Sequence, residues 1–298
     1  LQEDVHDWNV KLNNRERFLL THLFRFFTKG DEDISHGYTD SYQPMFKPTE
    51  IRMMLSSFNT AEANHIDAYS QLIDTVGLPE AEYEMFAEFA EMREKHECMF
   101  ADRTESKDGV KRSKVERIAL DLAVFSAFGE GMQLFSSFAV LLSFKRRGLM
   151  KGMSTIVEWS LRDESHHVDS MIKLFHTLIK EHPKVWTDEL KAAIRQTAKE
   201  MVVLEDRFID LMFSEGPLEG ITAEDTKTYI RYTTDRRMIQ LGLKPIYRQK
   251  DNPLDWLDEM MTAHTHTNFF EGRATEYSKG GVTGWNNNPW GFVERIKN

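Results

Sequence analysis

The sequence is poor in cysteine and in segments that would target or anchor a protein. Its 298 residues include one cysteine, Cys98, which excludes an internal disulfide and favours a reducing compartment. The first twenty residues are charged throughout, unlike a secretory signal, and no uninterrupted apolar run is long enough to span a bilayer. The chain does not begin with methionine, which suggests that it starts inside a longer one. We expect a cytoplasmic protein with no membrane partner.

An excess of positive charge is also lacking. The net charge of -10 argues against nucleic acid or an anionic membrane as the main partner. A hydrophobic content of 41% over this length is sufficient for a sizeable core in one large domain. Apolar residues recur at steps of three and four along most of the chain, and this spacing predicts an all-α fold.

The expected helices are separated by glycine, proline and polar segments. They cover residues 14–29, 48–75, 79–100, 113–147, 154–181, 187–213, 223–243 and 253–266. After residue 277 the sequence is rich in glycine and asparagine and has no helical period. We therefore expect one helical domain, residues 1–277, followed by a flexible tail, residues 278–298.

One short pattern, Glu-x-x-His, occurs twice, at Glu62 to His65 and at Glu164 to His167. Residues three apart share a helix face, so each copy directs a carboxylate and an imidazole to one place. A single copy is weak evidence, but two copies match half of a dinuclear metal site in a four-helix bundle. Such a site takes one more carboxylate from each of two other helices. His166 and His167 point about 100° apart on a helix, so both cannot join Glu164 at one metal. His167 has the required spacing of three residues from Glu164, and His166 does not.

Two further carboxylates are candidates for this site. Glu130 is the only charged residue between Asp121 and Lys145, on a helix that is apolar on all sides. Burying a carboxylate is costly unless it is paired or protonated, so Glu130 is either a ligand or a lone neutral acid. Asp31 directly follows the apolar stripe of the first helix; the alternative is that Asp31 and Asp33 are solvated loop acids.

The complete candidate set has four carboxylates and two imidazoles: Asp31, Glu62, Glu130, Glu164, His65 and His167. Four negative charges around one cavity would repel one another, and two divalent cations would balance them. Oxygen ligands with one imidazole per metal suit iron or manganese, and no thiolate is present to favour a structural zinc. The set indicates oxygen or peroxide chemistry.

Five stretches carry a close resemblance to a known family: FFTKGD, AEANHIDAY, FGEGMQLF, LRDESHH and NFFEGRATEY. Together they resemble the small, radical-generating subunit of class I ribonucleotide reductase, over essentially the whole chain. The resemblance implies a ferritin-like helical bundle with a dinuclear metal site in its core, held by the same six ligands. It places the radical-bearing tyrosine at Tyr69, four residues after His65, and Leu134 and Phe138 should line its surroundings.

The resemblance also implies how the protein works. In the family, the reduced metal pair reacts with an oxygen-derived oxidant and removes an electron and a proton from the tyrosine. The radical then passes to a large catalytic subunit, which converts ribonucleotides to deoxyribonucleotides. We expect two metal ions per chain, with di-iron favoured over di-manganese or a mixed pair. The expected partners are the large subunit and a second copy in a homodimer; the need for an activating flavoprotein is left open.

The resemblance assigns two further residues. Asp163 matches the aspartate that bonds a ligating histidine and serves the electron pathway, and Tyr277 matches the tail tyrosine that relays the radical across the subunit interface. The pathway tryptophan of the family lies further upstream of Asp31 than Trp8 does. We expect that tryptophan outside this chain and expect Trp8 to be a packing residue. The final VERIKN is partly basic, whereas family tails are often acidic with an apolar end.

Two other functions are compatible with the ligand pattern itself. A different ferritin-like oxidase would oxidise a small ligand directly, and Tyr69 would then be incidental. An iron-storage protein would be non-catalytic, but such folds are usually shorter and have no need of a tail such as Gly280 to Asn298. A stable tyrosyl radical and binding to a large reductase subunit would distinguish the three.

Overall fold

The computed structural model describes residues 1–78, 89–106 and 108–265, with side chains up to Met260. These residues form helices and two isolated β-bridges, with no strand among them, which confirms the all-α class. The chain divides into two units, Leu1–Met261 and Thr262–Asn298. Tyr277 and the tail at 278–298 lie outside the described residues, so the predicted domain boundary stays a prediction.

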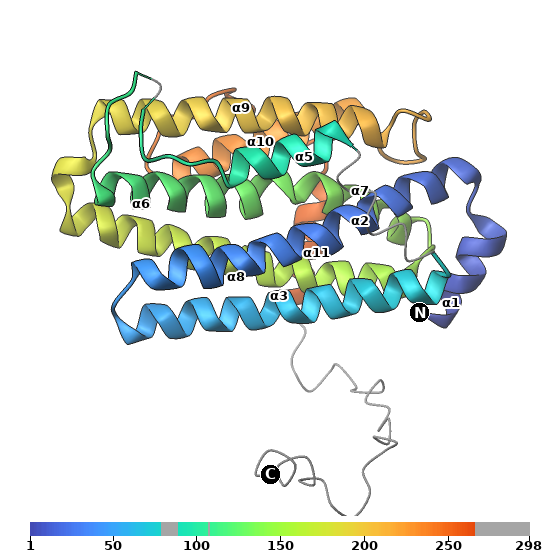
Figure 1. Ribbon diagram of the computed structural model, residues 1–298. Coiled ribbons are helices and arrows are strands. Elements are labelled where there is room, and N and C mark those ends of the chain that lie inside the picture. The colour runs from blue at the N-terminus through green and yellow to red at the C-terminus, as the bar shows by residue number, and fades with distance from the viewer. Residues whose placement is uncertain (79–88, 107, 266–298) are drawn as a thin grey trace, which may run out of the picture. The chain divides into compact units, whose positions relative to one another are not determined.

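Four helical segments surround the candidate metal site. They are α2 (Asn14–His36), α3 (Thr49–Val76), α8 (Lys151–Glu181) and the continuous run of α6 (Lys114–Leu122), η5 (Ala123–Gln133) and α7 (Phe135–Arg146). Figure 1 shows them as long, roughly aligned helices. Contacts join α2 to α3, α3 to α8, α8 to both η5 and α7, and α7 to α2. The four segments therefore enclose a common core.

Local signals in the sequence explain where these helices begin and end. Asn13 and Glu16 form a capping box at the start of α2, in which each backbone N–H donates to the other's side chain. Pro48 precedes α3, and Gly77 ends it in the left-handed region at φ 78°. The predicted bounds of α3 are therefore confirmed to within one residue.

The predicted end of the first helix at Gly30 is wrong. The helix α2 continues to His36 and leads into η2 (Gly37–Tyr42), a wide π-helical turn, and η3 (Gln43–Met45). One glycine inside a helix costs only about 1 kcal/mol relative to alanine. Asp31 and Ile34 are each 1% exposed, and burial of the apolar Ile34 side chain favours continuation of the helix. Asp31 is thus a buried helical residue, not a solvated loop acid.

The apolar central helix contains an unpredicted π-helical segment, η5, all of whose residues are buried. π-Helical turns are rare and often occur at functional sites. By length and composition alone, Lys114–Arg146 is long and apolar enough to span a membrane, although polar residues interrupt it. The sequence expectation considered only uninterrupted apolar runs and therefore did not include this helix. Its most apolar window is 94% buried among the described residues, as expected for a central core helix.

The remaining helices cover this core: α1 (Gln2–His6), η1 (Asp7–Lys11), α5 (Ala90–Met99), η6 (Pro183–Val185), α9 (Asp188–Met212), α10 (Ala223–Gln240) and α11 (Asp255–Thr265). Asp4 accepts hydrogen bonds from the backbone N–H groups of Gly152 and Met153 at the start of α8. The N-terminal segment therefore caps the helix that carries the second Glu-x-x-His.

Two outer residues test the predictions. Trp8 is 7% exposed and stacks on Phe24 with ring centroids 6.3 Å apart, so its predicted packing role is confirmed. The stretch 79–100 was expected to be a mostly solvated helix, but within α5 Lys95 is 2% exposed. Its ammonium lies 2.7 Å from the Glu205 carboxylate on α9, because a buried charge needs a partner.

Candidate metal centre

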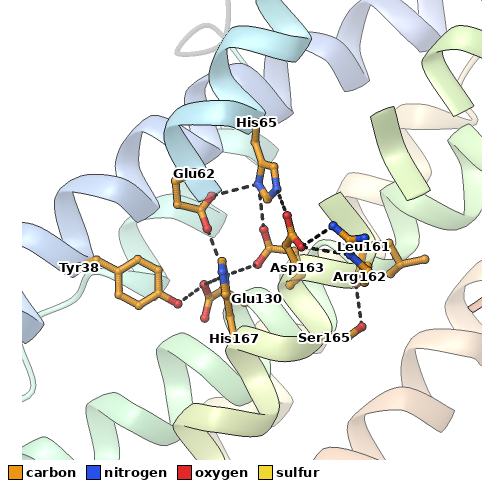
Figure 2. Close-up of polar contacts among 10 residues, drawn as sticks. Tyr38, Glu62, His65, Glu130, Leu161, Arg162, Asp163, Ser165 and His167 are labelled. Atoms are coloured by element: carbon orange, nitrogen blue, oxygen red, sulfur yellow. Dashed lines mark hydrogen bonds and ion pairs between the residues drawn. The ribbon is translucent and has the colours of Figure 1, made fainter. Parts of the chain in front are cut away.

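The six predicted ligands gather in one buried cluster. Asp31 comes from α2, Glu130 from η5, and the two Glu-x-x-His pairs from α3 and α8. None of the six is more than 4% exposed. Figure 2 shows Glu62, His65, Glu130 and His167 converging from three different helical segments. The i, i+3 spacing therefore places each carboxylate and imidazole as the sequence predicted.

The ligand atoms form two overlapping groups. Asp31, Glu62 and His65 make one group, and Glu62 joins Glu130, Glu164 and His167 in the other. Within each group the ligand atoms lie within 4.8 Å of one another. Because Glu62 belongs to both groups, the cluster is one site with two centres.

Glu62 and Glu164 each face both imidazoles. Glu62 has one oxygen 3.4 Å from Nδ1 of His65 and the other 3.2 Å from Nδ1 of His167. Glu164 has one oxygen 3.4 Å from each of the same two nitrogens. Two cations bound beside His65 and His167 would each find one oxygen of Glu62 and one of Glu164 nearby. Asp31 and Glu130 would then be terminal ligands, beside His65 and His167 respectively.

Unsatisfied polar atoms show that the cluster fits cations. Seven of its buried atoms have no hydrogen-bond partner among the described residues: Asp31 Oδ2, Glu62 Oε1 and Oε2, His65 Nδ1, Glu130 Oε2, Glu164 Oε2 and His167 Nδ1. Leaving buried polar atoms unpaired costs about 1–3 kcal/mol each. Carboxylate oxygens and imidazole nitrogens that converge in this way suit two divalent ions such as iron or manganese.

Several side chains of the cluster have raised pKa values, which favour a bound proton. Burial, and then the charge of Glu62, raise the pKa of Asp31 well above its usual range, and burial raises the pKa of Glu130 to about 7. Burial disfavours charged imidazoles, but the carboxylates beside them outweigh it and raise the pKa values of both histidines, that of His167 to about 12. A metal must displace these protons in order to bind.

Asp163 lies beside a ligand, as the resemblance implied. Its Oδ2 is 3.4 Å from Nε2 of His65, the ring nitrogen opposite the one that faces the cluster. Its other oxygen accepts from the Arg162 guanidinium at 3.3 Å. The Asp163 side chain is 33% exposed, so this contact connects the His65 side of the cluster with the surface.

Tyr69 lies in a dry aromatic environment on α3. It is fully buried and stacks on Phe27 with ring centroids 4.9 Å apart and an interplanar angle of 13°. Phe138 in turn stacks on Phe27, with ring centroids 5.0 Å apart. Burial, and then the charge of Asp31, raise the pKa of Tyr69, so the phenol is neutral. Its hydroxyl has no hydrogen-bond partner among the described residues.

One residue of the cluster was missed by the sequence analysis. Tyr38, on η2, is fully buried, and its hydroxyl donates a hydrogen bond to Oε1 of Glu130. Tyr38 lies seven residues, or two helical turns, after Asp31, and therefore on a related face. This spacing would have revealed it if the first helix had been predicted to continue past Gly30.

Comparisons with known proteins agree with this geometry. The family model for the ribonucleotide reductase small chain matches residues 1–253. The chain is 46% identical over 302 residues to the "Probable ribonucleoside-diphosphate reductase small subunit 048L" of invertebrate iridescent virus 3, covering 97% of this chain and 79% of that protein. The chain belongs to the ribonucleotide reductase small chain family.

Solved structures support the fold. The ribonucleotide reductase R2 subunit from Clostridium botulinum aligns with a TM-score of 0.79 at 22% identity, covering 88% of this chain and 81% of that one. The dimanganese(II)-NrdF of Streptococcus sanguinis aligns with a TM-score of 0.72 at 18% identity, covering 87% of each chain. The predicted ferritin-like fold, family and reductase assignment are confirmed, and the storage-protein and ligand-oxidase alternatives lose their support.

Proposed function

We propose that this chain is the radical-generating subunit of its reductase, with two metal ions held by the six clustered ligands and a radical stored on Tyr69. One observation carries the proposal: two carboxylates, Glu62 and Glu164, each approach both imidazoles with separate oxygens. The bound metal pair would supply one-electron oxidising power after reaction with an oxygen-derived oxidant.

The surroundings of Tyr69 suit a stored radical. Its raised pKa keeps the phenol protonated, so oxidation removes a proton together with the electron. Full burial and the stack on Phe27 exclude water and potential reductants from the ring. Tyr69 follows His65 by one helical turn, which keeps it near the centre that would oxidise it.

Asp163 would orient His65 and connect it to the partner. A carboxylate that accepts from the far ring nitrogen fixes the orientation and tautomer of a ligating imidazole. Because Asp163 and Arg162 reach the surface, we propose that this side faces the large catalytic subunit. Tyr277, outside the described residues, is the proposed relay across that interface. A homodimer in the cytoplasm, with or without an activating flavoprotein, completes the proposal.

The nature of the metals is part of the proposal. A ligand set of four carboxylates and two imidazoles accepts iron and manganese alike. The Streptococcus sanguinis relative is described as a dimanganese(II) protein, so manganese is an established occupant of this fold in another chain. We favour di-iron here, with di-manganese and a mixed pair as the other outcomes of the test.

Loading and spectroscopy test the proposal. The full chain is loaded separately with Fe(II) and with Mn(II), analysed for bound metal and exposed to dioxygen; a second Mn(II) sample receives superoxide. We expect two ions per chain and a sharp organic radical signal in electron paramagnetic resonance. Tyr69→Phe should keep both ions and lose the signal. Tyr229→Phe, which alters a buried tyrosine on α10, should keep both ions and the radical signal.

Activity with the partner completes the test. Mixed with the large subunit, the wild-type chain and Tyr229→Phe should support deoxyribonucleotide formation, and Tyr69→Phe should not. Unchanged activity and an unchanged radical in Tyr69→Phe would place the radical elsewhere and return Tyr69 to the core.

A further inference from the structure

Glu130 has little to hold it in its own part of the chain. It lies between Gly129 and Gly131 in η5, and neither neighbour has a side chain that could pack against its carboxylate. A Cβ at Gly129 would lie 2.5 Å from the Met99 sulfur, and one at Gly131 would lie 2.8 Å from Nε of Arg237. A side chain at either position would therefore require Met99 or Arg237 to shift. The orientation of Glu130 must be set by residues from other segments.

Two such residues contact the Glu130 carboxylate. His167 brings Nδ1 to 3.6 Å from Oε1, and Tyr38 donates its phenolic hydrogen to the same oxygen. The second oxygen, Oε2, has no hydrogen-bond partner among the described residues. Figure 2 shows Tyr38 reaching Glu130 from the side of the cluster opposite Asp163. Tyr38 thus fixes one oxygen and leaves the other available to a cation.

The donor is itself held rigidly. The Tyr38 ring is fully buried and meets Phe125 edge-on at 5.4 Å and His167 edge-on at 5.9 Å. Gly37, directly before it, allows this close approach, because a Cβ there would lie 2.9 Å from the Phe125 ring. A buried aromatic ring packed on several sides has few alternative rotamers. Its hydroxyl therefore stays at one position relative to η5.

We propose that Tyr38 is a positioning residue for the metal ion held by Glu130 and His167, because its phenol keeps Glu130 oriented as a terminal ligand. The inference rests on the proposed metal centre and extends it. Asp163 performs the corresponding task for His65 on the other side. Each half of the centre then has its own orienting group: a carboxylate that holds an imidazole, and a phenol that holds a carboxylate.

The test is Tyr38→Phe, which removes one oxygen atom and preserves the ring. Mn(II) binding to the full chain is measured by calorimetry and by electron paramagnetic resonance. We expect one ion to bind with nearly wild-type affinity and the other about 10–100-fold more weakly, the usual range for loss of a hydrogen bond to a ligand. At limiting Mn(II), the signal of a coupled pair should give way to that of isolated ions.

Tyr42→Phe is a matched control. Tyr42 lies one helical turn after Tyr38, is 5% exposed, and also packs on Phe125 at 4.8 Å. Its hydroxyl donates to the backbone oxygen of Asp121 at 3.0 Å, away from the cluster. Tyr42→Phe should bind both ions as the wild type does. Equal weakening in both variants would mean that Tyr38 acts through general packing, and would overturn the proposal.

A double variant shows whether Tyr38 acts through Glu130. If it does, Tyr38→Phe should weaken Mn(II) binding in the wild-type chain but add little to the effect of Glu130→Ala, because the group it positions is gone. If the wild-type chain binds two ions and Tyr38→Phe binds them equally well, the proposed role of Tyr38 is contradicted, but the proposed metal centre is not. A wild-type chain that binds no pair of ions would contradict the proposed function as well.

Discussion

The two halves of the centre use the same Glu-x-x-His motif in different surroundings. On the His65 side, the imidazole contacts Asp163, which is partly exposed and bonded to Arg162. On the His167 side, the imidazole lies 4.2 Å from the Phe58 ring, and Tyr38 closes the site around Glu130. One half therefore communicates with the surface, and the other is enclosed by aromatic rings.

This difference teaches that the motif and its surroundings set different properties. The i, i+3 spacing supplies the ligand atoms of both halves, so both can hold a cation. The neighbours decide whether a half exchanges charge with the outside or keeps a fixed, dry geometry. We therefore expect the two metal positions to differ in affinity and in exchange, even though their ligands have the same chemical types.

Removing a bridging ligand should affect both halves of the centre at once and have the largest effect on metal binding. Glu164→Ala deletes the carboxylate that faces both imidazoles, so both ions should be lost, with bound metal falling below one per chain. Elemental analysis after dialysis measures this. Glu181→Ala, at the exposed end of the same helix, is the control and should bind two ions. Two ions in Glu164→Ala would show that Glu164 does not bridge.

Removing a terminal ligand should affect one half only. Glu130→Ala should lose the ion beside His167, and Asp31→Ala should lose the ion beside His65, because Glu130 lies with His167 and Asp31 lies with His65. Each variant should retain about one ion per chain and form no radical. Metal analysis with electron paramagnetic resonance distinguishes them. Normal occupancy in Glu130→Ala would exclude Glu130 from the site.

Weakening an orienting group should have a smaller effect. Asp163→Asn keeps the shape of the side chain but removes its charge, so His65 is held less firmly and its ion should bind about tenfold more weakly. Competition with a metal-sensitive dye measures the two affinities. Asp169→Asn, on the exposed face of the same helix, should leave both affinities unchanged. Weaker binding only of the ion beside His167 would contradict the role of Asp163 in orienting His65.

The effect of pH should be the most gradual. Burial raises the pKa of Asp31, and that of Glu130 to about 7, so both groups hold protons that a cation must displace. Because His65 and His167 also have raised pKa values and hold protons, metal affinity should fall with falling pH over a wide range, most steeply below about 7, and binding should release protons. Calorimetry in buffers with different ionisation enthalpies measures the release. Affinity that is independent of pH would contradict these shifts.

Much of the fold and of the ligand set could be predicted, because local rules decide them. Pro48 and Gly77 bound α3 through backbone preferences, and helical spacing pairs Glu62 with His65. Glu130 was identifiable because a charge in an apolar helix is anomalous. These features depend on residues close together in the sequence.

The rest depends on tertiary contacts that leave no local pattern. Gly30 predicts a helix end, but the burial of Ile34 on the continued helix outweighs the small cost of the glycine. The π-helical turn at η5 lies in a segment that is apolar on all sides, so a shift of register changes no visible periodicity. Lys95 is in an acidic stretch and reads as solvated, because its partner Glu205 is far along the chain. Tyr38 was missed because the first helix was predicted to end at residue 29, whereas α2 continues to His36 and leads directly into η2.

The central claim is that the duplicated motif builds one centre with two metal ions, and anomalous X-ray diffraction tests it most directly. Crystals of the full chain grown with Mn(II) are measured at the manganese absorption edge. We predict two separate peaks inside the bundle, one at Nδ1 of His65 and one at Nδ1 of His167, with Glu62 and Glu164 contacting both. A single peak, or peaks only at the surface, would contradict the account.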